Sequence, residues 1–376
     1  MKNQLNRRRF VKEAAITSAA VVVANGLNAS VPNDSSGISK TDQTMKKGSD
    51  SLLLTDGLCN PAITMRPCQL LSTVCIKGGA KCPLIETEKA KKILSRLKND
   101  PTTAIRLVSH VDEIPHFTML KESDFSSPDV NDVINRKRDL DVLQRLGLVP
   151  GDTRRARYLY ELLFTRIKST QNLCAYETKS WEGCELAYSG IYEKVIEKGW
   201  QEIVYQRSKS EMAEFRQRNE NEINKTNRLF IRPHHLMCFS CYYDGGKGQV
   251  SRSNDTLFEI WQRIKNNPDI LVTLVESTCM ACDCCDGFYP PTGRCVHSCG
   301  LIRDYYKDLI VFQKMGLMPG ATMKGREAFS LLFEKVHSTK DVCGYGDGIV
   351  RSNEWEICGN HEGNPGYART RITGVF

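Results

Sequence analysis

The sequence predicts an α+β protein built from two tandem copies of one helix-rich mixed unit. Gly-Leu-Val-Pro-Gly at 147–151 matches Gly-Leu-Met-Pro-Gly at 316–320, and Leu-Leu-Phe at 162–164 matches the same three residues at 331–333. The offset between matching positions is 166 residues near the start of the copies and 169 at these two motifs. Because the matches keep their order and spacing, we interpret the chain as an internal duplication.

The first copy is expected to occupy residues 51–190. Its apolar residues recur at helical spacing over 87–98, around 131–146 and over 152–169, which predicts three helices. The short apolar segment at 103–108 is typical of a strand.

The second copy is expected to occupy residues 229–376. A helix is predicted to begin at Asn254 or Asp255 and to end at Pro268, and a β-branched strand follows at 270–275. The apolar residues of that helix are Leu257, Ile260, Trp261 and Ile264. Two more helices are predicted at 301–315 and 323–337, joined by a turn at 316–320 that contains glycine and proline.

A charged stretch at about 190–222 is predicted to be helical, so residues 191–228 are expected to be a helical linker between the copies. Lysines, arginines and acidic residues alternate there, which is typical of a solvated helix face.

The N-terminus resembles a twin-arginine (Tat) export signal. Arg7 and Arg8 are followed by a spacer, two apolar residues and Lys12, and an apolar stretch at 14–24 is shorter than a membrane span. We interpret residues 1–29 as a signal peptide. The alternative is a basic arm followed by a short core helix.

An exported protein would function in the periplasm or elsewhere outside the cytoplasm, where disulfides persist. The polar segment 30–50 is expected to be a disordered linker, and no transmembrane segment is expected in the mature protein. The formal net charge of the whole chain is +8, with no basic stripe interleaved with aromatic residues, so nucleic-acid binding is not expected.

Sixteen cysteines are the strongest chemical signal in the chain. Ten of them lie in the second copy, including Cys-x-x-Cys pairs at Cys238/Cys241 and Cys279/Cys282. Thiolates at this spacing bind zinc or iron–sulfur clusters, or pair as disulfides, and the spacing alone leaves these alternatives open.

The opening of the second copy, Arg-Pro-His-His-Leu-Met-Cys at 232–238 with Gly-Lys-Gly at 246–248, resembles the DUF1284 family over about residues 229–315. Members of that family are described as iron–sulfur binding proteins. The resemblance implies a cluster, with a four-iron cluster preferred and zinc as the alternative. The four ligands that it implies are Cys238, Cys279, Cys282 and Cys295.

This chain carries more potential ligands than the family pattern. We expect His234 and His235 to ligate the cofactor or to donate hydrogen bonds to it. The additional thiols expected at the cofactor are Cys241, Cys284, Cys285 and Cys299.

The first copy lacks most of these groups, because Cys68, Gln69 and Ser72 stand where the second copy has His234, His235 and Cys238. It is expected to hold no metal. Two cysteine pairs recur in both copies and are expected to be disulfides, Cys174 with Cys184 and Cys343 with Cys358.

The sequence thus predicts an exported iron–sulfur or other metal-binding protein with a redox or electron-transfer role, acting with a redox partner or a small molecule. The alternative is a non-catalytic binding protein of the cell envelope, stabilised by disulfides or zinc. No catalytic residue is assigned, because neither Gly-x-Ser-x-Gly nor His-Glu-x-x-His occurs in the chain. Whether the protein is an enzyme is left open.

Overall fold

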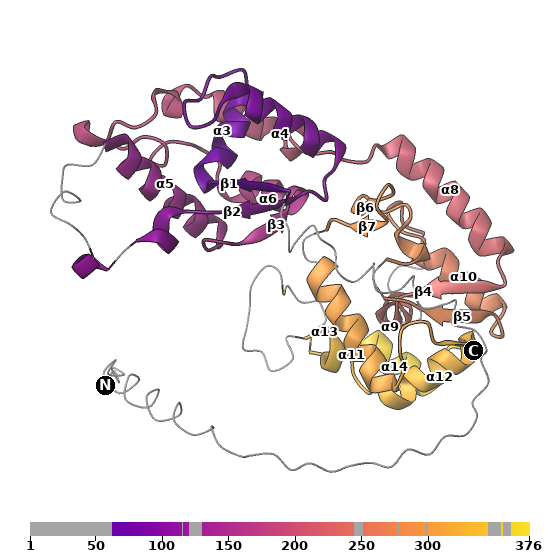
Figure 1. Ribbon diagram of the computed structural model, residues 1–376. Helices are drawn as coiled ribbons and strands as arrows, with labels where there is room; N and C mark the ends of the chain where they lie inside the picture. Colours follow the sequence, from indigo (N-terminus) through magenta and orange to yellow (C-terminus); the bar gives the residue numbers. More distant parts are fainter. Residues whose placement is uncertain are drawn as a thin grey trace, which may run out of the picture. The chain divides into compact units, whose positions relative to one another are not determined.

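Two three-stranded sheets with the same strand order and sense organise the described part of the chain (Figure 1). The computed structural model describes residues 62–114, 116–119, 130–243, 251–276, 278–297, 300–344, 355 and 362–376. The predicted signal peptide and the linker at 30–50 lie outside these residues.

In the first sheet, β1 (Ile63–Met65) runs parallel to β2 (Ala104–Leu107), and β2 runs antiparallel to β3 (Thr153–Arg155). Ile63 pairs with Ile105, which is fully buried because β2 is the central strand and helices cover it. The helices of this half are α3 (Pro67–Lys77), α4 (Thr87–Asn99), α5 (Val130–Leu146), α6 (Ala156–Arg166) and α7 (Ile191–Lys198).

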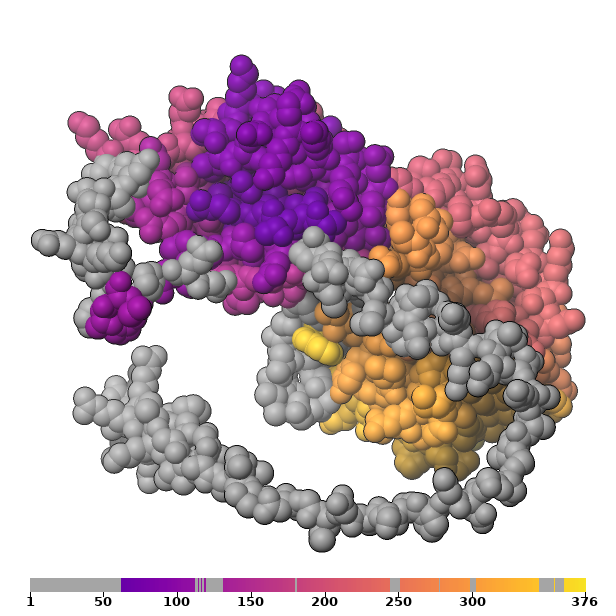
Figure 2. All heavy atoms as spheres, viewed as in Figure 1, coloured from indigo at the N-terminus to yellow at the C-terminus, as the bar shows by residue number. Residues whose placement is uncertain are grey.

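In the second sheet, β4 (Arg228–Ile231) runs parallel to β5 (Leu271–Leu274), and β5 runs antiparallel to β8 (Thr322–Lys324). Its helices are α8 (Lys209–Lys225), α9 (Pro233–Tyr242), α10 (Leu257–Asn266), α11 (Tyr305–Met315), α12 (Gly325–Lys335), α13 (Lys340–Cys343) and α14 (Pro365–Thr373). The charged side chains of α8 form part of the salmon-coloured surface in Figure 2.

Each half has its own hydrophobic core. One cluster of buried side chains runs from Ile63 to Val204, and the other runs from Ile223 to Val375. In the second core, Phe239 of α9 stacks on Trp261 of α10 with ring centroids 5.7 Å apart. Helix α10 presents its apolar residues to this core at the predicted helical spacing, which explains why the sequence pattern located it.

A buried carboxylate connects the first strand, the first helix and a later helix in each half. In the second half, Asp308 of α11 is fully buried and accepts a hydrogen bond from Arg232 Nε at 2.6 Å. In the first half, the fully buried Asp139 of α5 accepts from Arg66 Nε at 2.7 Å and from the backbone N–H of Cys68 at 2.9 Å. Both arginines precede a proline that begins a helix, so the carboxylate also lies at a helix N-terminus.

The mixed α+β class is confirmed, and most of the predicted helices and strands are found within a few residues of their expected bounds. The charged stretch predicted to be helical at about 190–222 is instead divided between α7 and α8, and Tyr192 and Val195 of α7 belong to the core of the first half. Strands β3 and β8 were not predicted from the sequence. Each is three residues long and rich in polar side chains, so no alternation of apolar residues marks it. None of the helices in the described ranges combines the length and apolar character needed to cross a bilayer.

We predict that Asp308→Asn destabilises the protein by about 3 kcal/mol, because it leaves the buried Arg232 guanidinium without its counter-ion. Asp139→Asn is expected to have a smaller effect, because the side chain of its partner Arg66 is 35% exposed and water can solvate its charge. The free energy of unfolding in urea measures both.

Asp269→Asn is the control, because Asp269 is half-exposed and pairs with Lys324 and Arg326 at the surface. Such pairs contribute at most about 1 kcal/mol. Equal losses in all three variants would contradict the role of the buried carboxylates.

Candidate metal centre and thiol pair

One group of metal-binding side chains stands out among the described residues. The ligand atoms of Cys285, Asp286 and His297 all lie within 4.8 Å of one another, and no other three Cys, His, Asp or Glu residues in the described ranges do so. The group is held by a small hairpin in which β6 (Phe288–Tyr289) pairs with β7 (Arg294–Cys295). The hairpin brings Cys285, before β6, next to His297, after β7.

The backbone of the hairpin is shaped around the His297 ring. Gly287 donates its N–H to Cys285 Sγ at 3.4 Å and accepts from Val296 N at 2.7 Å. A Cβ atom at Gly287 would lie 2.4 Å from His297 Nδ1. Only glycine therefore leaves room for the imidazole beside this thiol.

His297 is placed between a thiol and a carboxylate. Its Nδ1 lies 3.7 Å from Cys285 Sγ, and its Nε2 lies 2.9 Å from Asp286 Oδ1. Hydrogen bonds to Asp286, then to Cys285 and Cys295, raise the pKa of His297 well above its ordinary value. The hydrogen bond from His297, together with the hydrogen bond from Arg157 at 2.8 Å, holds the pKa of Asp286 well below its usual range.

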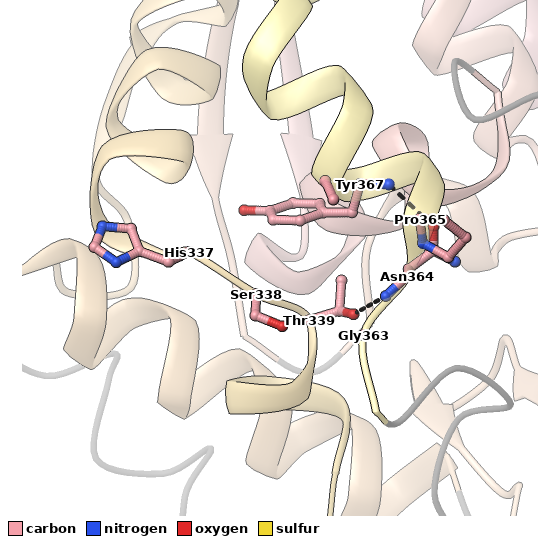
Figure 3. Close-up of a pocket in the computed structure, with 8 residues that line it drawn as sticks. His337, Ser338, Thr339, Gly363, Asn364, Pro365 and Tyr367 are labelled. Atoms are coloured by element: carbon pink, nitrogen blue, oxygen red, sulfur yellow. Dashed lines mark hydrogen bonds between the residues drawn. The ribbon is translucent and has the colours of Figure 1, made fainter.

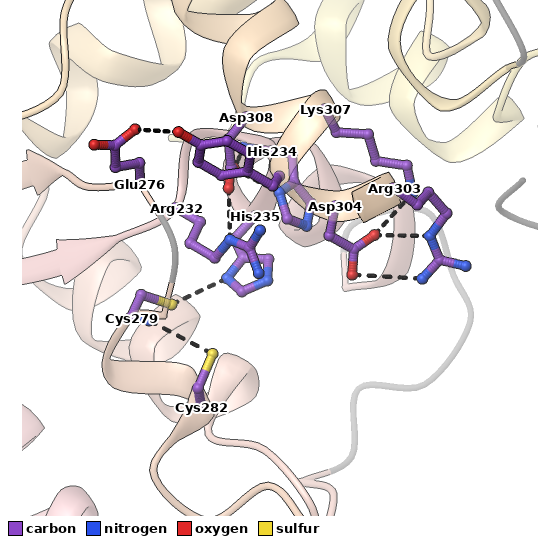
Figure 4. A network of polar contacts seen from close by, with 11 residues as sticks. Arg232, His234, His235, Glu276, Cys279, Cys282, Arg303, Asp304, Lys307 and Asp308 are labelled. Atoms are coloured by element: carbon purple, nitrogen blue, oxygen red, sulfur yellow. Dashed lines mark hydrogen bonds and ion pairs between the residues drawn. The ribbon is translucent and has the colours of Figure 1, made fainter. Parts of the chain in front are cut away.

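Cys279 and Cys282 form a separate pair at the start of the same segment (Figure 4). They lie at the two ends of one turn of 3-10 helix, η7 (Met280–Cys282), which follows the Cys279 N-cap. The N–H of Cys282 donates to Cys279 Sγ, and the N–H of Cys279 donates to Cys282 Sγ at 3.5 Å. Each sulfur thus receives a backbone hydrogen bond from the other residue.

Two basic residues of the Arg-Pro-His-His motif face this pair. His235 Nδ1 lies 3.3 Å from Cys279 Sγ. The positive charge of the buried Arg232 acts on both thiols. Burial raises the pKa of Cys279, whereas the hydrogen bond with Cys279 lowers the pKa of Cys282 below its ordinary value. Burial also holds the pKa of His235 well below its ordinary value, so this imidazole is neutral.

His234 faces away from the pair and belongs to the carboxylate network of α11. Its Nδ1 lies 2.6 Å from Asp308 Oδ1, and Lys307 and Arg303 bond to Asp304 close by (Figure 4). His234 therefore makes a hydrogen bond that supports the fold, while its neighbour His235 contacts a thiol.

Cys238 and Cys241 lie on α9 and line a cavity of about 30 Å³ together with His234 and Cys343. Thr339 and Asn364 line this cavity and also a second, larger hollow of about 270 Å³ (Figure 3). The larger hollow contains His337 and the start of α14 but no cysteine.

The four thiols implied by the family resemblance are distributed over these places. Cys238 lies at the α9 cavity, Cys279 and Cys282 form the pair, and Cys295 lies beside His297. They do not form a group within 4.8 Å in the described part of the chain. Cys284 is fully buried, and burial raises its pKa to about 11, so it resembles a core residue more than a ligand. Cys299 and the Gly-Lys-Gly at 246–248 lie outside the described residues.

The two cysteine pairs expected to be disulfides are only partly described. Cys174 and Cys184 are neighbours, with the N–H of Cys184 donating to the carbonyl of Cys174 at 2.8 Å, and both carry thiols. Cys358, the expected partner of Cys343, lies outside the described residues. The disulfides stay predictions.

His297 and Asp286 were not among the residues that the sequence indicated as ligands. The available signal for His297 was its Cys-x-His spacing after Cys295. The contact of Asp286 with His297 depends on how the hairpin folds.

Comparison with known proteins gives no match to this chain: no family model, no curated protein and no solved structure is significantly similar to it. The resemblance to the DUF1284 family, and the iron–sulfur cluster that it implies, are therefore hypotheses that rest on the motif alone.

Proposed function

We propose that this is an exported metal-binding protein whose metal centre is the β6–β7 hairpin. The proposal rests mainly on one observation, the close approach of Cys285, Asp286 and His297. Cys285 and His297 would bind the metal directly, and Cys295 would join them after a shift of its side chain, because its sulfur does not lie within 4.8 Å of both other ligand atoms. Cys295 belongs to the same site because it forms a hydrogen bond with His297 and is paired with Phe288 in the hairpin.

The separation of Cys285 Sγ and His297 Nδ1 fits two ligands of a tetrahedral ion. With bonds of about 2.3 Å to sulfur and about 2.0 Å to nitrogen, two ligands of a tetrahedral zinc ion lie roughly 3.6 Å apart. Cys285 Sγ and His297 Nδ1 are separated by 3.7 Å. A bound ion would displace the proton from Nδ1 and take its place between the two atoms.

Asp286 would orient the histidine. A metal-bound histidine commonly donates its second ring N–H to a carboxylate, which fixes the tautomer and the ring orientation. The 2.9 Å contact between His297 Nε2 and Asp286 Oδ1 matches this arrangement. Arg157 holds the other carboxylate oxygen at 2.8 Å.

The donor set favours zinc. Two thiolates and an imidazole suit zinc, whereas an iron–sulfur cube needs four ligands, most often thiolates, at one place. The iron–sulfur centre at Cys238, Cys279, Cys282 and Cys295 is the second candidate, and it would require these segments to come together when the cluster is inserted. A zinc site in an exported protein would stabilise the fold or bind a ligand at an open position.

We also propose that the two halves are copies of one unit and that only the second kept a metal site. The shared strand order and the matching Arg66–Asp139 and Arg232–Asp308 contacts support the duplication. In the first half, the segment from Ser109 to Phe117 has no cysteine where the second half has its cysteine-rich segment.

We predict about one equivalent of zinc per chain in the purified mature protein, measured by elemental analysis. Cys285→Ser, Cys295→Ser and His297→Gln should each abolish stoichiometric zinc because each removes a ligand. Asp286→Asn should weaken zinc binding about 10- to 100-fold, because it removes the group that orients His297.

His337→Gln is the matched control, since His337 is exposed and bonds only to the carbonyl of Glu334. It should keep its zinc. Full zinc retention by His297→Gln would contradict the site. Iron and sulfide near four each per chain would instead support the iron–sulfur centre.

Export has its own test. Replacing Arg7 and Arg8 together with lysine should keep the precursor uncleaved in the cytoplasm, because the twin-arginine pair is the feature that the pathway reads. Immunoblots of fractionated cells compare it with a variant in which Lys2 is changed to Arg. Normal processing of the double variant would show that residues 1–29 do not act as a Tat signal.

A further inference from the structure

We propose that Cys279 and Cys282 are a redox-active dithiol that exchanges with disulfides, as an activity separate from the metal centre. The pair shares no residue with the β6–β7 hairpin site. It therefore stands whether or not the hairpin binds metal.

The local geometry places the two sulfurs for bond formation. Cys279 and Cys282 span one 3-10 turn, closed by the hydrogen bond from Cys282 N to Cys279 O at 2.8 Å. A Cys-x-x-Cys turn of this kind keeps two cysteines near enough to form a disulfide and to release it without rearranging the chain. The backbone hydrogen bonds to both sulfurs stabilise negative charge on them.

The surrounding groups favour a thiolate. Arg232 has a guanidinium that acts on both sulfurs, and its backbone N–H bonds to Cys279 Sγ. Its side chain is only 7% exposed, so solvent screens this positive charge weakly. A nearby buried cation stabilises a thiolate.

Unequal exposure assigns the two sulfurs different roles. Cys282 is half-buried, whereas Cys279 is only 7% exposed and lies against His235. An external disulfide can reach Cys282 more readily than Cys279. Cys282 is therefore the attacking thiol and Cys279 the resolving thiol, whose Sγ lies 3.3 Å from His235 Nδ1.

The proposed thiol–disulfide exchange takes two steps. The Cys282 thiolate attacks one sulfur of a substrate disulfide, forms a mixed disulfide and expels the other substrate sulfur as a thiolate. Cys279 attacks Cys282 Sγ and gives its proton to the second substrate sulfur, which leaves as a thiol, while the first substrate thiolate takes a proton from water. The substrate disulfide is reduced by two electrons to two thiols, while the pair is oxidised to the Cys279–Cys282 disulfide. The reverse reaction oxidises a substrate dithiol.

The test uses the full mature protein, reduced with dithiothreitol and then incubated with glutathione disulfide. Acid quenching, alkylation and peptide mapping follow. We expect a Cys279–Cys282 disulfide that dithiothreitol reverses, and in Cys279→Ser a glutathione adduct trapped on Cys282. We also expect iodoacetamide at pH 7 to alkylate Cys282 about ten-fold faster than Cys284 in the reduced protein. A disulfide-linked model peptide, used in parallel, distinguishes peptide disulfides from small ones as substrates.

Cys284→Ser is the control, because Cys284 lies in the same segment but is fully buried. It should leave the disulfide unchanged. The wild-type measurements need no variant, so they hold even if a substitution prevents folding. The proposal would be overturned if Cys279 and Cys282 both stayed reduced in glutathione disulfide. Loss of bound metal in the Cys279→Ser and Cys282→Ser variants would also overturn it. Failure of the zinc site alone would leave the pair's exchange intact.

Discussion

The carboxylate of Asp308 is the interaction on which the arrangement of the second half depends. A helix that begins directly after a strand has backbone N–H groups with no intrahelical partner, and an anion at its N-terminus stabilises them. Asp308 supplies this anion from α11 and pairs with Arg232, so one buried group joins β4, α9 and α11. Asp139 makes the corresponding contacts in the first half. Burial makes the Arg232–Asp308 pair costly to break, because either partner alone would be a buried unpaired charge.

The Arg232–Asp308 pair also fixes the groups that surround Cys279 and Cys282. Because Arg232 is fixed by Asp308, its charge and its backbone N–H are held against the Cys279–Cys282 pair, and the first turn of α9 directs His235 to Cys279. The first half has a similar Arg66–Asp139 contact, but Gln69 stands three residues after Arg66, where the second half has His235 three residues after Arg232. An Arg-Pro sequence paired with a buried carboxylate therefore occurs in both halves, whereas the contact between His235 and Cys279 belongs to the second.

The sequence predicted the elements that carry strong periodicity and missed what depends on tertiary contacts. Helix α10 was located by its apolar spacing, whereas β8 is too short and polar to be recognised. Cysteine spacing identified the region of the site but not which cysteines lie together, because sulfurs close in sequence can face different neighbours. His297 joins Cys285 only through the hairpin between them, and that contact depends on the lack of a side chain at Gly287.

X-ray absorption spectroscopy of the full-length protein, as purified, can establish whether the hairpin binds zinc, because it reports the metal and its ligands without any substitution. We expect a zinc edge and a mixed shell, with sulfur at about 2.3 Å and nitrogen at about 2.0 Å, as Cys285, Cys295 and His297 would provide. An iron edge with iron–iron scattering, or a zinc shell of four sulfurs, would contradict the assignment of the metal to the hairpin.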